Sequence, residues 1–188
     1  ISEKYTQKID VKLYKSILNE VDLNKLLKNL NEKSLISVDT ETSSLNPQEA
    51  DLIGVSIGCA PGEAYYIPIG HKNIKCLKKD FVIKKLKPIL EDSSIKKIGQ
   101  NIKYDFIVLK NSGIELNPID DTMLLSYVLD AGNNRHNMDT LSELHLGHKT
   151  IKYKDVVGSG KKQLNFSDIN LKEATEYAAE DADVTFRL

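Results

Sequence analysis

The pattern of apolar and polar residues predicts an α/β fold whose sheet begins with three consecutive strands. Residues 35–38 form a short β-rich run, and residues 52–59 alternate apolar with small side chains. The turn Ala60-Pro61-Gly62-Glu63 then leads into a third apolar run at 64–69. Runs joined by short turns pair as neighbouring antiparallel strands. We therefore expect the sheet to begin with three antiparallel strands.

After residue 80 the apolar residues recur mainly at helical spacing, with short β-like runs at 95–98 and from residue 119. The last helix is the clearest, because Asn170 precedes it as a candidate cap with Glu173 at the third position. Alternating strands and helices favour parallel pairing. The sequence thus predicts a mixed central sheet, antiparallel in its first three strands and parallel later, flanked by helices. Those helices are expected at residues 81–90, 102–109, 123–129, 139–146 and from 170 onward.

A short amphipathic helix from Asp22 to Leu30 precedes the first strand. We therefore expect a helical lead-in at residues 1–31 and one main domain at 32–188. A length of 188 residues with 40% hydrophobic content is enough for such a core. The chain starts without Met and stops within a helical pattern, so we expect it to be a fragment of a longer protein.

Composition excludes several classes of protein. Cys59 and Cys76 are the only cysteines, too few for a disulfide framework or a cysteine zinc site. No apolar stretch reaches the roughly 18 to 20 residues of a membrane span, and residues 1–10 lack the apolar core of a signal peptide. We expect a soluble cytoplasmic protein with no membrane partner.

The formal net charge of −1 hides an uneven distribution. Residues 72–110 carry eleven lysines and four acids, which gives +7, whereas residues 1–71 sum to −3 and 111–188 to −5. One interpretation is that the lysines lie on solvated helix faces. The other is that the lysine-rich third holds a polyanion while the acidic parts hold metal ions. The sequence leaves both open.

Acidic residues at three places suggest a chemical function. Asp39 and Glu41 are two apart on a predicted strand, so they share a face and repel each other unless a cation neutralises them. Asp105 lies early in a predicted helix, and Tyr177 and Asp181 are spaced i, i+4 on the last helix among alanines. Each feature alone also fits a strand end, a helix dipole or a surface pair.

Their joint occurrence is more informative. Asp-Thr-Glu-Thr-Ser-Ser-Leu at 39–45, Gly-Gln-Asn-Ile-Lys-Tyr-Asp at 99–105 and Tyr-Ala-Ala-Glu-Asp-Ala-Asp-Val at 177–184 closely resemble the three exonuclease motifs of family A DNA polymerases, within the DEDDy exonuclease superfamily. The resemblance covers the chain from about residue 35 onward. It implies a ribonuclease H–like fold and a metal-dependent 3′→5′ exonuclease. This would remove nucleotides from single-stranded or frayed DNA 3′ ends, as the proofreading module of a DNA polymerase I–type enzyme.

The resemblance also implies roles for individual residues. Asp39, Glu41 and Asp181 would bind one divalent ion, Asp39 and Asp105 a second through water, and Tyr177 would orient the attacking water. Mg²⁺ is expected, with Mn²⁺ or Zn²⁺ able to substitute. Implied partners are a single-stranded DNA 3′ end and a C-terminal polymerase domain of the same chain, in a monomer associated with the bacterial nucleoid. The residues expected to hold the substrate are Leu45, Gln100, Asn101, Tyr104, Arg135 and Tyr153.

Two alternatives remain at this point. One is a ribonuclease D–like or Werner-type exonuclease of the same superfamily, which would act on RNA or on other DNA ends. The other is a domain that keeps the fold as a structural platform and has lost catalysis. All four carboxylates and Tyr177 are present, which favours an active enzyme.

Overall fold

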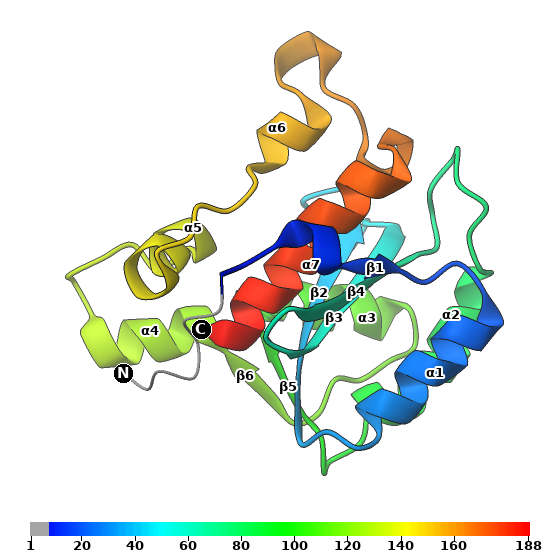
Figure 1. The fold of residues 1–188 in the computed structure, drawn as a ribbon, viewed down its shortest axis with the longest axis horizontal. Coiled ribbons are helices and arrows are strands. Elements are labelled where there is room, and N and C mark those ends of the chain that lie inside the picture. Colours follow the sequence, from blue (N-terminus) through cyan, green and yellow to red (C-terminus); the bar gives the residue numbers. More distant parts are fainter. Residues whose placement is uncertain (1–7) are drawn as a thin grey trace.

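A six-stranded mixed sheet forms the centre of the computed structural model, which describes residues 8–188 except the side chain of Lys161 (Figure 1). Residues 1–7 of the predicted lead-in lie outside the described residues. The strands are β1 (Lys15–Ser16), β2 (Leu35–Thr42), β3 (Leu52–Ala60), β4 (Glu63–Pro68), β5 (Lys96–Gly99) and β6 (Ile119–Asp121). The α-helices are α1 (Glu20–Leu30), α2 (Lys79–Leu90), α3 (Lys103–Asn111), α4 (Thr122–Asp130), α5 (Met138–Leu141), α6 (Tyr153–Val157) and α7 (Leu171–Arg187).

The pairing of the strands follows the order β1-β4-β3-β2-β5-β6. β2, β3 and β4 pair antiparallel, and β5 and β6 extend the sheet in parallel from β2, as the sequence predicted. The two-residue strand β1, parallel to β4 at the edge, was not predicted. Two residues are too few to produce an alternating pattern. β2 also runs on to Thr42, so Asp39 lies within this strand rather than at its end.

Side chains of the central strand β2 alternate between two packed faces. Ile36 and Val38 join the main core, which also holds apolar residues of the first three helices. Ser37 faces the opposite way, toward the long helix α7, which crosses β2, β3 and β4 (Figure 1). Leu23 and Leu30 of α1 belong to the same main core. The division between lead-in and main domain at residue 31 stays a prediction.

Helix α7 packs against the sheet at very short range. The Ser37 hydroxyl donates a hydrogen bond to the Ala182 carbonyl at 2.6 Å. A Cβ added to Gly58 would lie 2.9 Å from that carbonyl and 2.5 Å from the Ser37 hydroxyl. Ala178 and Ala179 of the helix are fully buried. Small side chains on both sides therefore set how closely α7 approaches β2 and β3.

The helices differ from the prediction in several places: α6 was not predicted, and the ends of α2, α3 and α4 lie one or two residues from those expected. α1 begins at Glu20, two residues earlier than expected, because the Asn19 side chain caps it by accepting a hydrogen bond from the Asp22 N–H. The helix predicted at 139–146 is instead the short α5 followed by a π-helical turn, Ser142–Leu146. The Asn170 cap on α7 is confirmed, since its side chain accepts from the Glu173 N–H.

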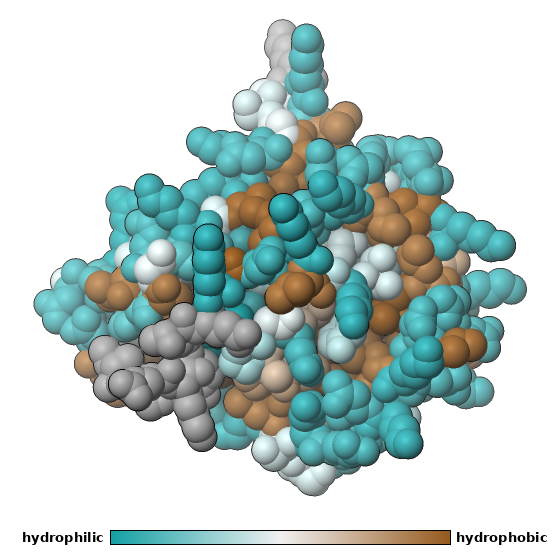
Figure 2. Space-filling view, in the orientation of Figure 1, coloured by the Kyte–Doolittle hydropathy of each residue, from teal (hydrophilic) through white to brown (hydrophobic). Residues whose placement is uncertain are grey.

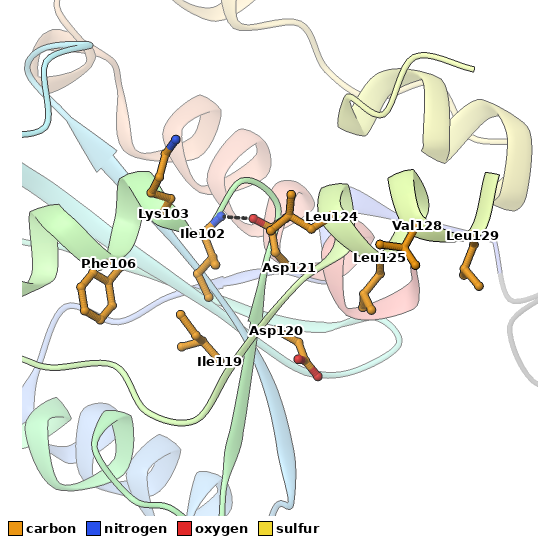
Figure 3. Close-up of a pocket in the computed structure, with 10 residues that line it drawn as sticks. All are labelled: Ile102, Lys103, Phe106, Ile119, Asp120, Asp121, Leu124, Leu125, Val128 and Leu129. Atoms are coloured by element: carbon orange, nitrogen blue, oxygen red, sulfur yellow. Dashed lines mark hydrogen bonds between the residues drawn. The ribbon is translucent and has the colours of Figure 1, made fainter. Parts of the chain in front are cut away.

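The surface is hydrophilic around most of its outline (Figure 2), but α4 carries apolar side chains outward. Leu124, Leu125, Val128 and Leu129 line a shallow hollow of about 520 Å³ beside Ile119 (Figure 3). Within the described residues, the helices are all too short or too polar to cross a membrane.

We expect Gly58→Ala to destabilise the fold, because its Cβ would push α7 away from the sheet. Overpacking of this kind costs about 1–3 kcal/mol. Chemical denaturation measures the loss, and Gly58→Val should lose more. A Gly58→Ala protein as stable as the wild type would show that α7 is not held this closely.

Candidate active site

Three carboxylates from two distant elements meet at the sheet. Asp39 and Glu41 point from β2, and Asp181 comes from α7. One oxygen atom from each lies within 4.8 Å of the others. The i, i+2 spacing on the strand places the first two on one face, and the close packing of α7 brings the third to them. This is an oxygen-ligand set that suits a hard divalent cation.

The electrostatics of this cluster are unfavourable without a cation. Burial, followed by the neighbouring carboxylates, raises the pKa of Asp39 and Glu41 well above the usual range. Burial and the adjacent Glu180 carboxylate raise the pKa of Asp181 to about 8. In residues 8–188 the three carboxylates form no ion pair with Lys, Arg or His. A bound cation would offset this repulsion, so the residues present fit a divalent metal.

Asp105 lies beside this cluster but outside the set within 4.8 Å. Its Oδ1 accepts hydrogen bonds from the backbone N–H and the hydroxyl of Thr40, at 2.9 and 2.6 Å. Burial raises its pKa to about 7 despite these bonds. The Asp105 carboxylate in turn raises the pKa of Asp39. α3 thus supplies a fourth acid, oriented by the residue between Asp39 and Glu41.

Tyr177 lies one helical turn before Asp181 on α7, and both line the same cleft. Burial raises the pKa of the phenol far above its ordinary value, so it stays neutral. Phe166 packs against the Tyr177 ring, with 5.9 Å between ring centroids. Phe166 also stacks with Tyr153, at 6.3 Å and 10° between the ring planes, and the two tyrosine rings contact each other at 5.9 Å. The fully buried Phe166 ring thus fixes both tyrosines.

A cleft of about 940 Å³ opens over the carboxylates. Of the residues predicted to hold substrate, four line it: Leu45, Asn101, Tyr104 and Tyr153. Leu45 is 95% exposed, although it is apolar. The Tyr104 hydroxyl bonds with the Thr42 hydroxyl at 2.6 Å and donates to the Ser44 carbonyl.

Asn101 reaches the cleft through an unusual backbone conformation. Its φ of 59° is left-handed, which Asn tolerates better than most residues. Asp121 holds this loop, because its carboxylate accepts from the Asn101 N–H at 3.0 Å. It also accepts from the Ile102 N–H at 3.1 Å (Figure 3). Asp121 therefore stabilises the loop between β5 and α3.

The other two predicted substrate residues lie outside the lining of the cleft. The Gln100 amide donates to the His136 carbonyl at 2.7 Å and accepts from the Thr122 hydroxyl at 2.5 Å. Arg135 is exposed on the loop after α4. Sequence reasoning missed Gln163, Leu164 and Asn165, which line the cleft. They belong to an irregular polar segment with no periodic pattern that could have revealed them.

We expect the metal-free protein to become more stable as the pH falls from about 8 to about 5. The folded carboxyls bind protons at a pH where the unfolded chain has released them, so stability is lost as pH rises through their raised pKa values. Thermal unfolding in chelator measures this, with a shift of about 2–4 °C for each kcal/mol.

At pH 8, Mg²⁺ should raise the melting temperature of the wild type. Asp181→Asn should raise the melting temperature in the absence of metal, and Mg²⁺ should raise it less in this variant than in the wild type. An Asp181→Asn protein that melts below the wild type in chelator would contradict the repulsion.

Comparison with known proteins agrees with this geometry. Residues 14–188 match the family model described as 3′-5′ exonuclease. The chain is 46% identical over 181 residues to DNA polymerase I of Pseudomonas aeruginosa and 44% identical over 176 residues to that of Borreliella burgdorferi. Each alignment covers 93% of this chain but only 20% and 19% of the relative. The chain thus spans about one fifth of these relatives.

Solved structures show the same fold. Trypanosoma brucei RNase D superposes with a TM-score of 0.75 at 17% identity, covering 94% of this chain and 63% of that one. Escherichia coli RNase D superposes with a TM-score of 0.69 at 20% identity, covering 92% of this chain and 42% of that one. The expected ribonuclease H–like mixed sheet is confirmed. The chain therefore belongs to the 3′–5′ exonuclease family, and it matches bacterial DNA polymerase I over a fifth of that protein's length.

Proposed function

We propose that this chain removes nucleotides one at a time from single-stranded or frayed DNA 3′ ends, as the proofreading part of a DNA polymerase I–type protein. The observation that carries the proposal is the convergence of Asp39, Glu41 and Asp181 at an open cleft. The DNA polymerase I relatives support DNA as the substrate. The alternative of an inactive platform is disfavoured, because such a cluster destabilises the fold without a cation.

Asp39, Glu41 and Asp181 would hold one divalent ion, and Asp105 with Asp39 would hold a second. Two such ions supply activation of a water and stabilisation of the leaving 3′ oxygen. Mg²⁺ is the expected metal, because carboxylate and phosphate oxygens are its preferred ligands, and Mn²⁺ or Zn²⁺ would substitute.

The protein's own groups would orient the reactants. Tyr177 keeps its proton, so its hydroxyl can accept from one partner and donate to another, which suits holding a water at a fixed angle. Asp181 lies one turn away on α7 and lines the same cleft, so the hydroxyl is held beside the proposed metal ligands. The two hydrogen bonds from Thr40 orient the Asp105 carboxylate, so no basic side chain is needed to hold it in place.

The cleft lining suits a single strand. Leu45 and Tyr153 present apolar surfaces on which a terminal base can rest, and neither has the donor pattern needed to read a base edge. Gln100 and Arg135 would contact the strand at the margins. We therefore expect little sequence preference and a strong preference for unpaired ends. The same proposal includes a C-terminal polymerase domain, a monomeric state, a nucleoid-associated bacterial location and a main domain at 32–188.

A gel assay tests the activity. A 5′-labelled single-stranded DNA incubated with Mg²⁺ should yield a ladder shortened from the 3′ end, and a chelator should abolish it. A matched RNA strand tests the ribonuclease D–like alternative, because RNase D proteins share the fold. Faster degradation of RNA than of DNA would contradict the proposal.

Removing one carboxylate should abolish hydrolysis. We expect Asp39→Ala and Asp181→Ala each to lower the rate by about a thousandfold or more, because the metal contribution is worth several kcal/mol. Single-turnover cleavage measures the loss, and circular dichroism checks the fold. Asp155→Ala, an exposed acid on α6, is the control. Equal activity in all three variants would contradict the metal scheme.

Phe166→Leu should lower kcat more than it raises KM, because the Tyr177 ring loses one of the two aromatic rings that pack against it. Misplacing a reacting group by about 1 Å can cost about a hundredfold, so we expect a loss of roughly ten- to a hundredfold. Phe106→Leu on α3, away from both tyrosines, is the matched control. The double variant Tyr177→Phe/Phe166→Leu gives the contradicting outcome. If its kcat is lower than that of Tyr177→Phe by the same factor that Phe166→Leu costs the wild type, Phe166 does not act through the Tyr177 hydroxyl.

A further inference from the structure

The catalytic cleft does not end at the carboxylates. A second hollow of about 410 Å³ shares the lining residues Ser43 and Asn165 with it, so the two hollows are adjacent. Backbone of β3 and of the segment after β4 borders the hollow, where the N–H groups of Ile69 and Gly70 both donate to the Ile53 carbonyl, at 2.9 and 2.8 Å. These two hydrogen bonds join the segment after β4 to β3 at this border.

Backbone bonds hold the walls of the hollow as well. The Lys72 N–H donates to the Ser167 carbonyl at 3.0 Å, which ties the segment after β4 to the turn that carries Asn165. On the opposite side the Asp51 N–H donates to the Ser43 hydroxyl at 2.9 Å. The hollow beside the cleft is therefore bordered by segments that are hydrogen-bonded to one another.

The charged groups on the hollow are mainly basic. Lys72 and Lys79 line it, and Asp51 is the one acid among its lining residues. The Lys72 ammonium lies 2.8 Å from the Asp168 carboxylate, so part of its charge is neutralised. Lys79, the first residue of α2, is half-buried and forms no ion pair with any group of residues 8–188. Its charge is available to an anion.

We propose that this hollow is a second subsite, which takes a phosphate of the single strand beyond the bond being cut. The proposal rests on the proposed function. Two lysine ammonium groups, a serine hydroxyl and an asparagine amide are donors of the kind that bind nucleic-acid phosphates without reading sequence. The strand would cross from the carboxylates over Ser43 and Asn165 to Lys72 and Lys79. Lys72 and Lys79 belong to the lysine-rich stretch 72–110, so two of its lysines would bind phosphate.

Substrate length provides the test. A dinucleoside monophosphate has a single phosphate, which the carboxylate cluster must occupy, so nothing remains for the lysines. An octanucleotide has further phosphates that can reach them. We would measure kcat/KM for both substrates at several salt concentrations in Mg²⁺, for the wild type, Lys79→Gln and Lys72→Gln/Lys79→Gln. Lys84→Gln makes the same charge change at an exposed position on α2, outside the hollow.

The double variant should lose about tenfold in kcat/KM on the octanucleotide and keep wild-type activity on the dinucleotide. The salt dependence of octanucleotide cleavage should weaken by about 0.7 in log–log slope for each lysine that contacts a phosphate. Lys84→Gln should change neither.

The subsite would be overturned if the double variant lost kcat/KM equally on both substrates. It would also be overturned if that loss were no greater than the loss with Lys84→Gln. If even the wild type leaves the dinucleotide uncut, the salt slope on the octanucleotide decides alone. A wild type that shortens neither substrate would instead overturn the proposed exonuclease function.

Discussion

The close approach of α7 to the sheet is the constraint on which the rest of the site depends. Gly58 and the alanines of α7 leave no room for a larger side chain, and the Ser37 hydroxyl bonds directly to a helix carbonyl. Asp181 follows Ala178 and Ala179 on the same helix, so the packing that excludes bulk also carries a carboxylate to β2. Moving the helix outward would carry Asp181 away from Asp39 and Glu41 on β2.

The same packing creates an electrostatic problem. Buried carboxylates this close together raise one another's pKa values and oppose folding at neutral pH. Hydrophobic packing of the main core must offset this repulsion until a cation binds. Such a conflict between local stability and chemistry is typical of functional sites, where the protein keeps an unfavourable arrangement because the reaction needs it.

Much of this could be predicted from the sequence. The alternating runs predicted β2, β3 and β4, and the Asn170 cap placed the start of α7, because both signals are local. The shared face of Asp39 and Glu41 follows from strand geometry alone. That Asp181 joins them did not follow from spacing. It came from the resemblance of three motifs, and the structure supplies its physical cause in Gly58.

Other features had no local signal. The orientation of Asp105 depends on Thr40, sixty-five positions away in the chain. The role of Phe166 depends on rings contributed by α6 and α7. Gln100 makes tertiary contacts with Thr122 and with the backbone of His136, which no motif reveals. Contacts between distant segments are set by the three-dimensional packing, so single-sequence patterns cannot report them.

The central claim is that packing of α7 on β2 builds a cation site from three carboxylates. A crystal of the protein grown with Mn²⁺, with anomalous diffraction recorded at the manganese edge, tests this most directly. The account predicts a peak coordinated by oxygen atoms of Asp39, Glu41 and Asp181. Absence of a peak there, with those side chains turned apart or bound to basic groups instead, would contradict it.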